Sequence, residues 1–312
     1  MTKPQVLQVG SYPEWDQTPL DTAFNMHQYF AAKDKAAFLC VVGHRVQAIA
    51  TRGDLGAAAD MIAACPNLQL IAVYGVGYDA VDLASCRARG IAVTNTPGVL
   101  DGDCADLAVT MMLGLTRNLV QAEAWVRNGN WAKQSFPLQR RAWGKRAGIL
   151  GLGRIGAEVA KRLQGFGMQI AYSARSAKDV AYEFIPDPVM LAARSDFLFV
   201  TAIANAETRH IVGAEVLAAL GSQGVLINIS RAGNIDELAL LDALESRALA
   251  GAALDVFEDE PNLDPRFLAL DNVLLQPHHA SGTFETRQAM GQLMRDNLTA
   301  HFAGQPLLTP VL

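Results

Sequence analysis

The chain has 312 residues, enough for one large domain or, more commonly, two domains of ordinary size. Hydrophobic residues make up 51% and charged residues 18% with no low-complexity tract, which excludes a disordered chain, a collagen and a coiled coil. With 26 Lys and Arg against 31 Asp and Glu, the net charge is −5, which argues against a nucleic acid or an anionic membrane as the main partner.

Targeting and metal-binding signals are missing from the sequence. Residues 1–10 lack the basic stretch and apolar run of a signal peptide, and no stretch approaches the roughly 20 apolar residues of a membrane-spanning helix. We therefore expect a cytoplasmic protein. The four cysteines are irregularly spaced without a CxxC pair. This distribution predicts neither a zinc site nor a disulfide framework, so no metal is expected.

Short apolar runs, which we interpret as strands, alternate with helical stretches along most of the chain. Residues 99–119 interrupt the alternation with apolar residues at helical spacing and few charges, which predicts a mostly buried helix. The alternation restarts at residue 146 and continues to residue 276. The predicted strands are residues 6–9, 36–42, 68–73 and 91–94 in the first part, and 146–150, 169–172, 197–201, 225–229, 250–254 and 273–276 in the second.

This alternation predicts the fold class. Only crossover helices can return the chain to start a parallel neighbour, so the pattern indicates an α/β protein with doubly wound parallel sheets. Residues 285–302 have the spacing of an amphipathic helix. We expect this last helix to pack back onto the first part of the chain.

The strongest local signal is G-L-G-R-I-G at residues 151–156. Gly151 would make the tight turn, Gly153 would let the backbone approach a pyrophosphate, and Gly156 would let helix and strand touch. The N-terminus of the next helix would supply N–H groups and partial positive charge to the anion. GxGxxG alone is weak, but here it lies between a predicted strand and a predicted helix. We therefore interpret it as a dinucleotide site rather than a structural turn.

The segment after the second strand of this unit indicates which dinucleotide binds. NAD enzymes place an acidic residue there to accept the ribose hydroxyls. This chain instead has Ser173, Ala174, Arg175 and Ser176, which offer no carboxylate to repel a phosphate and a guanidinium to bind one. We expect NADPH. The alternative is that Arg175 is a solvated loop residue and that the cofactor is NADH.

Three polar residues, Arg231, Asp255 and His278, each follow a predicted strand. The carboxyl ends of parallel strands share one edge of the sheet, which is also the edge that holds the glycine turn. Glu260 lies five residues after Asp255 in a turn-like stretch that can bring it toward His278. Taken singly, each of these residues is more often a surface charge or a packed side chain. Together at a cofactor edge they predict an active site.

Six motifs, in this order and spacing, resemble the D-2-hydroxyacid dehydrogenase family over nearly the whole chain. Within that family the sequence is most similar to NADPH-dependent hydroxypyruvate/glyoxylate and hydroxyphenylpyruvate reductases, partly through A-R-S at residues 174–176 and the ending H-F-A-G-Q-P-L-L-T-P. The motifs are G-V-G-Y-D (75–79), T-N-T-P-G-V-L (94–100), G-L-G-R-I-G (151–156), N-I-S-R-A-G (228–233), L-D-V-F-E-D-E-P (254–261) and Q-P-H-H-A-S-G-T (276–283).

The resemblance implies an oxidoreductase that reduces a small 2-oxo acid of the glyoxylate or hydroxypyruvate type to the D-2-hydroxy acid with NADPH. It also implies two Rossmann-like domains. A discontinuous substrate domain would comprise residues 1–98 and 284–312, and the dinucleotide-binding domain residues 99–283. In relatives the segment aligned with residues 131–140 crosses to the other subunit near its substrate pocket, so a homodimer is implied.

The resemblance also implies residue roles. Arg231 would hold the substrate carboxylate and polarise the carbonyl, and the N–H groups of Val76 and Gly77 would complete that carboxylate cradle. His278 would give the proton, and Glu260 would stabilise its imidazolium. Asp255 would accept from the nicotinamide carboxamide. The full set of implied cofactor contacts is Gly151, Leu152, Gly153, Arg154, Ile155, Gly156, Ser173, Ala174, Arg175, Ser176, Ala202, Ile229, Arg231, Asp255, His278 and Ala280.

Some features depart from the family, and alternatives stay open. The loop at Ala202 lacks a proline common in relatives, and Ala232 separates Arg231 from the next glycine. Arg52 either reaches the far end of the substrate or is a surface arginine.

Two alternative functions stay open. One is an NAD-dependent oxidative 2-hydroxyacid dehydrogenase, which the missing acid at Ala174 disfavours. The other is a nucleotide-sensing corepressor on this fold, which the complete catalytic set disfavours.

Overall fold

The computed structural model describes residues 3–312, and the chain divides into two compact units. The first unit comprises residues 1–100 and 282–312, and the second comprises residues 101–281. Each unit has one sheet in which all paired strands are parallel, so the predicted α/β class with parallel sheets is confirmed. No helix within residues 3–312 has both the length and the apolarity to span a membrane. Which unit serves substrate and which serves cofactor stays a prediction.

The sheet of the first unit has five strands in the order β2-β1-β3-β4-β5. The central strands are apolar because helices cover both faces of such a sheet, and every residue of β4 is buried. The strands are β1 (Gln5–Gln8), β2 (Asn25–Gln28), β3 (Ala48–Arg52), β4 (Leu70–Tyr74) and β5 (Ala92–Thr94).

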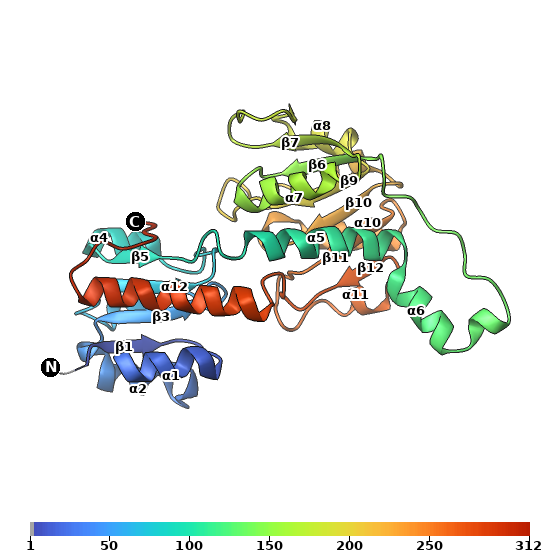
Figure 1. The fold of residues 1–312 in the computed structure, drawn as a ribbon. Coiled ribbons are helices and arrows are strands. Elements are labelled where there is room, and N and C mark those ends of the chain that lie inside the picture. The colour runs from blue at the N-terminus through green and yellow to red at the C-terminus, as the bar shows by residue number, and fades with distance from the viewer. Residues whose placement is uncertain (1–2) are drawn as a thin grey trace. The chain divides into compact units, whose positions relative to one another are not determined.

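Helices from both ends of the described chain cover this sheet. Helix α12, drawn in red in Figure 1, packs along β4, and its Arg295 pairs with the buried carboxylate of Asp16 in α1. The helices are α1 (Glu14–Ala23), α2 (Lys35–Val42), α3 (Ala59–Ala63), α4 (Leu83–Arg89) and α12 (Phe284–Phe302), with 3-10 turns η1 (Tyr29–Ala31) and η2 (Gly43–Arg45).

One predicted strand of this unit is wrong. Residues 36–42 form most of helix α2, and the strand instead follows at β3. The side chain of Asp34 accepts the N–H of Ala37 and so caps the helix, which an apolar run by itself does not reveal. Strand β2 was not predicted because its residues are mostly polar and only partly buried at the edge of the sheet.

The sheet of the second unit has seven strands in the order β12-β11-β10-β9-β6-β7-β8. All six strands predicted here are present, within two residues at each end, and the two-residue strand β8 is added at one edge. The strands are β6 (Arg146–Leu150), β7 (Gln169–Ser173), β8 (Glu183–Phe184), β9 (Phe197–Val200), β10 (Val225–Asn228), β11 (Gly251–Leu254) and β12 (Val273–Leu275).

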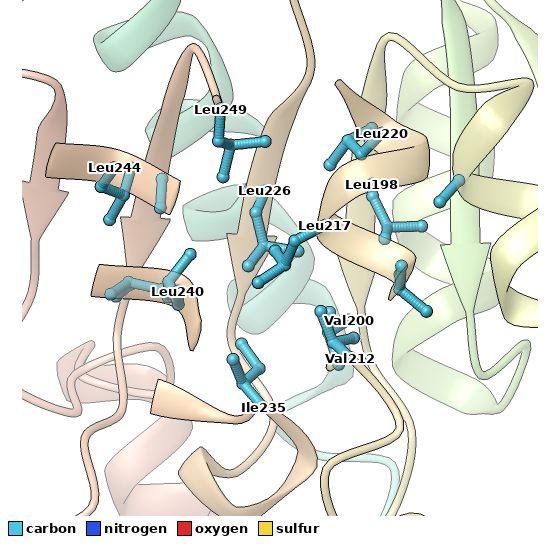
Figure 2. Close-up of a cluster of buried hydrophobic side chains, with 14 of the residues drawn as sticks. Leu198, Val200, Val212, Leu217, Leu220, Leu226, Ile235, Leu240, Leu244 and Leu249 are labelled. Carbon is cyan, nitrogen blue, oxygen red and sulfur yellow. The ribbon is translucent and has the colours of Figure 1, made fainter. Parts of the chain in front are cut away.

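The core of this unit lies between the sheet and its helices. Figure 2 shows Leu198, Val200 and Leu226 from the strands meeting Leu217 from α9 and Leu240 from α10, all at most 2% exposed. Burying such side chains is the main force that holds the strand ends, and hence the loops after them, in place. The helices are α5 (Asp101–Thr116), α6 (Leu119–Arg127), α7 (Arg154–Gln164), α8 (Pro188–Ala193), α9 (Ala214–Leu220), α10 (Glu237–Glu245) and α11 (Arg266–Ala269), with 3-10 turns η3 (Asn130–Ala132) and η4 (Ala232–Asn234).

Residues 119–143, which we call the arm, form an extension of the second unit. Figure 1 shows α6 and the segment after it reaching away from the seven-stranded sheet before the chain returns to β6. The arm carries several exposed large apolar side chains, namely Leu119, Val120, Val126, Trp131, Leu138 and Trp143.

Candidate active site

The candidate site lies at the carboxyl edge of the seven-stranded sheet. The glycine turn follows β6, Arg231 follows β10, Asp255 follows β11 and His278 follows β12. Strands β10, β11 and β12 are direct neighbours in the sheet, and β6 lies two strands from β10. A parallel sheet therefore places these four loops on one edge, although they are far apart along the chain.

The surroundings of the three glycines in the turn show which of them the packing requires. At Gly151, φ is +103°, and an added Cβ would lie 2.5 Å from the backbone of Ala202. At Gly156 an added Cβ would lie 2.4 Å from the carbonyl oxygen of Gly151. Gly153 differs, because an added Cβ there would meet nothing within 4 Å. Two of the glycines are thus required by packing, whereas the third opens onto free space in front of the helix.

That open position is the N-cap of helix α7. The first backbone N–H groups of a helix have no acceptors within it, and together with the helix dipole they favour an anion. Arg154, the first residue of α7, is exposed, while Leu152 is buried and fixes the turn to the core. The residues present therefore fit a pyrophosphate placed against Gly153.

The segment after β7 contains one hydroxyl that is hydrogen-bonded within the protein and two exposed polar side chains that are not. Ser173 is buried, and its hydroxyl donates to the carbonyl of Pro186 at 2.9 Å. Arg175 and Ser176 are exposed, and the Arg175 guanidinium forms no ion pair or hydrogen bond within residues 3–312. A free guanidinium and hydroxyl at this strand end can bind a 2′-phosphate, and no acidic side chain stands in residues 173–176 to oppose it.

A buried amide network shapes the loop that carries Arg231. The Asn228 side-chain oxygen accepts the N–H and the hydroxyl of Ser230, at 3.0 and 2.7 Å, and its NH₂ donates to the carbonyl of Arg231 at 3.2 Å. Asn234 donates to the Ser230 hydroxyl at 3.0 Å and to the carbonyl of Ala202 at 2.9 Å. Both amides are at most 1% exposed. They tie the Arg231 loop to the Ala202 segment that packs on the glycine turn.

Asn228 and Asn234 were missed by sequence reasoning. The available signal was an amide at each end of N-I-S-R-A-G-N, a segment that leaves a buried strand. Arg231 itself is half-buried, and its Nη1 donates to the carbonyl of Ser230 at 2.9 Å. Its charge also helps to lower the pKa of Glu260, so the guanidinium lies within electrostatic reach of that carboxylate.

His278 and Glu260 form a close polar pair at this site. The imidazole Nδ1 lies 2.6 Å from Glu260 Oε2, while Glu260 Oε1 accepts the N–H of Phe257 at 2.9 Å. Burial would raise the pKa of Glu260, but the hydrogen bonds from His278 and Phe257 outweigh it and hold that pKa below its usual value. The carboxylate is therefore ionised near neutral pH and can only accept, so Nδ1 carries a proton toward it.

The backbone presents this imidazole in an unusual conformation. At His278 φ is +51°, in the left-handed region that non-glycine residues seldom adopt and that often occurs at functional sites. The second ring nitrogen, Nε2, forms no hydrogen bond within the described part of the chain, and about a third of the side chain is exposed. Nε2 is thus the nitrogen that can exchange a proton with a bound molecule.

Asp255 holds the turn that follows β12. Its side chain is fully buried, and its two oxygens accept the N–H groups of His279 and Ala280 at 2.7 and 2.9 Å. Burial raises the pKa of this carboxyl, and the two N–H bonds act against that rise. The contacts explain why His278 stands where it does. A contact of Asp255 with a nicotinamide carboxamide stays a prediction.

The two residues expected to bind a carboxylate through their N–H groups, Val76 and Gly77, follow β4 in the first unit. The carbonyl of Gly75 accepts the N–H of Thr96 at 2.9 Å, and the carbonyl of Val76 accepts from the side chain of Asn95 at 2.9 Å. Because a trans peptide directs its N–H opposite to its C=O, the N–H groups of Val76 and Gly77 point away from β5. Neither N–H has a protein acceptor within residues 3–312, so both can bind a carboxylate.

Comparisons with known proteins show what the chain is similar to. Residues 109–280 match the family profile described as D-isomer specific 2-hydroxyacid dehydrogenase, NAD binding domain. The chain is 43% identical, over 98% of both sequences, to glyoxylate/hydroxypyruvate reductase A HPR2 of Arabidopsis thaliana.

Two solved structures show the same fold over nearly the whole chain. A 2-hydroxyacid dehydrogenase from Ketogulonicigenium vulgare Y25 superposes with a TM-score of 0.94 at 65% identity, covering 100% of this chain and 99% of that one. An NADPH-dependent glyoxylate/hydroxypyruvate reductase from Sinorhizobium meliloti, in complex with NADP and malonate, superposes with a TM-score of 0.92 at 39% identity, covering 99% and 97%.

Proposed function

Because the chain belongs to the D-isomer specific 2-hydroxyacid dehydrogenase family, we propose that it reduces a small 2-oxo acid of the glyoxylate or hydroxypyruvate type to the D-2-hydroxy acid, with NADPH as the hydride donor. The observation that carries this proposal is the His278–Glu260 pair at 2.6 Å, on the sheet edge that also holds Arg231 and the glycine turn. This edge combines a proton donor, a carboxylate-binding cation and a dinucleotide turn.

His278 supplies the proton in this proposal. Glu260 holds Nδ1–H, so the ring orientation is fixed and Nε2 faces the substrate oxygen that becomes the hydroxyl. The nearby carboxylate also stabilises the imidazolium before the proton is transferred. NADPH, when bound, supplies the hydride to the carbonyl carbon. Asp255 keeps the 278–280 turn in place through its two N–H contacts.

Arg231 binds and polarises the substrate. Its guanidinium pairs with the carboxylate and directs an N–H toward the carbonyl oxygen, where negative charge develops during reduction. In the first unit, the N–H groups of Val76 and Gly77, which have no protein acceptor within residues 3–312, are suited to binding a carboxylate. The buried network of Asn228 and Asn234 fixes the loop of Arg231, which keeps this donor preorganised.

The cofactor is held by the glycine turn and by the segment after β7. Gly153 and the start of α7 would hold the pyrophosphate, and Arg175 and Ser176 would hold the 2′-phosphate. Support comes from the open space at Gly153 and from the unpaired guanidinium. The remaining contacts of this binding surface are Leu152, Arg154, Ile155, Ser173, Ala174, Ala202, Ile229 and Ala280.

A steady-state assay tests the function. We expect the purified protein to oxidise NADPH in the presence of glyoxylate or hydroxypyruvate, with a higher kcat/KM for NADPH than for NADH. Absence of turnover with both acids and both cofactors, together with tight NADPH binding, would contradict the proposal and favour a nucleotide-sensing binding protein. A preference for NADH in the oxidative direction would favour an NAD-dependent dehydrogenase.

We further propose that the protein is a cytoplasmic homodimer assembled through the arm. The arm exposes several large apolar side chains along one segment. Such a patch is typical of a surface that another chain covers. Light scattering should give twice the chain mass, and Leu138→Asp should reduce it. Leu268→Asp, at another exposed leucine that lies in α11 outside the arm, serves as the control and should leave the mass unchanged.

A further inference from the structure

Glu260 belongs to an exposed turn of residues 257–262, which we call the Glu260 turn. It follows β11 and begins at Phe257, whose buried ring packs against Phe267 of α11 at a centroid distance of 5.8 Å. The three residues after Phe257 are exposed. Because an exposed turn is mobile unless further contacts hold it, the 2.6 Å contact of Glu260 with His278 depends on what fixes this backbone.

One side chain from outside the turn binds that backbone. Glu237, the first residue of α10, accepts the N–H of Glu258 through Oε2 at 3.0 Å. The preceding N–H, that of Phe257, is bound from within the turn by Glu260 Oε1 at 2.9 Å. Within residues 3–312, the structure records no other hydrogen bond between the backbone of this turn and another element. Glu237 therefore ties the Glu260 turn to α10.

The start of α10 is a firm support for this contact. Asp236 caps the helix by accepting the N–H of Ala239 at 3.1 Å, and the N–H of Asp236 donates to the carbonyl of Val212 at 3.0 Å. Leu240, one turn further on, is buried in the core of the second unit. A carboxylate that starts from such a fixed backbone can hold a turn that would otherwise move.

The position of Glu237 is unfavourable for its negative charge. Burial raises the pKa of the Glu237 carboxyl, and the N–H of Glu258 acts against that rise. The nearby carboxylates of Glu258, Asp264 and Asp259 raise the pKa further. Carboxyl groups held in such surroundings are more frequent at functional sites than elsewhere. The electrostatics therefore agree with a role beyond the stability of α10.

We propose that Glu237 is a positioning residue for proton transfer, because it holds the Glu260 turn where Glu260 reaches His278. This inference rests on the proposed function, in which Glu260 and His278 deliver the proton. Glu237 acts through the backbone: it binds the N–H of Glu258, and the turn then places the Glu260 carboxylate against Nδ1 of His278. The turn needs an oxygen acceptor of the right reach at residue 237. A neutral amide oxygen meets that need as well as a carboxylate does.

Two substitutions separate reach from charge. Glu237→Gln keeps the reach and loses the charge, whereas Glu237→Asp keeps the charge and withdraws the oxygen by one methylene. With glyoxylate and saturating NADPH, we expect Glu237→Asp to lower kcat about tenfold and to change KM less than about twofold. Glu237→Gln should keep kcat within about twofold of the wild type.

Glu215→Asp is the matched control. It makes the same shortening in the first turn of another helix, α9, at an exposed side chain that has no hydrogen bond in the described part of the chain. It should leave kcat unchanged. Melting temperatures of all variants are measured as well, and the assay is run at a temperature at which each variant is folded.

A double-mutant cycle with Glu260→Gln gives an independent readout. If Glu237 acts through Glu260, Glu237→Asp should lower the kcat of the Glu260→Gln variant by less than about twofold. A purely structural role would not produce this loss of additivity. Reductions that multiply would show that Glu237 affects kcat by another route, and they would overturn the inference.

The outcomes distinguish the inference from the proposed function. If the wild type reduces glyoxylate but Glu237→Asp has the kcat of Glu215→Asp, the positioning role is wrong and the proposed function stands. The role is also wrong if Glu237→Gln lowers kcat as much as Glu237→Asp, because the charge would then matter rather than the reach. If the wild type reduces neither glyoxylate nor hydroxypyruvate with either cofactor, the proposed function fails and the inference fails with it.

Discussion

Replacing Glu260 by glutamine tests whether its carboxylate activates His278. The amide oxygen of glutamine can still accept the N–H of Phe257, so the loop keeps that contact. The charge-assisted bond to His278 at 2.6 Å is lost. Such a bond contributes about 1.5–3 kcal/mol, and each 1.4 kcal/mol changes a rate about tenfold. We therefore expect Glu260→Gln to lower kcat/KM for glyoxylate about ten- to hundredfold, measured by steady-state oxidation of NADPH.

The same substitution has a signature in the pH dependence of stability. Because the pKa of Glu260 is lower in the folded protein than its usual value, its stabilising contribution is complete above the usual value and is lost as the pH falls from that value through the lower pKa of the folded protein. Melting temperatures of the wild type should therefore fall more between about pH 6 and pH 3 than those of Glu260→Gln.

Glu258→Gln is the control for both measurements. It makes the same chemical change in the same loop, at an exposed side chain whose carboxylate lies 3.7 Å from His210 rather than near His278. If Glu260→Gln matches Glu258→Gln in both kcat/KM and acid stability, the activating role of Glu260 is refuted.

Other substitutions address the remaining parts of the site. Arg231→Ala and His278→Ala should each lower kcat about a hundredfold or more, and wild-type turnover by His278→Ala would refute its role as proton donor. Arg175→Ala should raise KM for NADPH far more than for NADH, whereas equal changes would indicate NAD specificity. Gly151→Ala should lower the free energy of unfolding by at least about 2 kcal/mol, because its Cβ would overlap Ala202. Gly153→Ala should fold normally and raise KM for NADPH, and an unchanged KM would exclude a pyrophosphate there.

The sequence predicted the parts of the site that depend on topology. Once a parallel sheet is inferred, Arg231, Asp255 and His278 must lie at one edge because each follows a strand. The glycine turn was predictable for the same reason, since a strand and a helix flank it. The periodicity of buried strands is reliable in the second unit, where both faces of the sheet are covered.

The features of the site and fold that the sequence did not predict depend on the local conformation of the backbone. Asn228 and Asn234 matter because the loop after β10 folds back over its own strand end, which residue spacing does not indicate. The left-handed backbone at His278 likewise depends on Asp255 holding the two following N–H groups. In the first unit, the apolar run at residues 36–42 is compatible with a strand or with a helix. The capping contact from Asp34 favours the helix.

The first unit is formed by two stretches that are far apart in the sequence, and this has a consequence for biosynthesis. The N–H of Val311 donates to the carbonyl of Val93 at 2.7 Å, and the side chain of Asn297 binds the N–H groups of Leu308 and Thr309. A ribosome delivers the five strands of this unit before the second unit, yet the helix and tail that complete the first unit are made only after residues 101–281. Residues 101–281 are contiguous, so the second unit can finish folding while the earlier strands still await their covering helix. The nascent first unit is therefore the part of the chain that most needs protection from aggregation during translation.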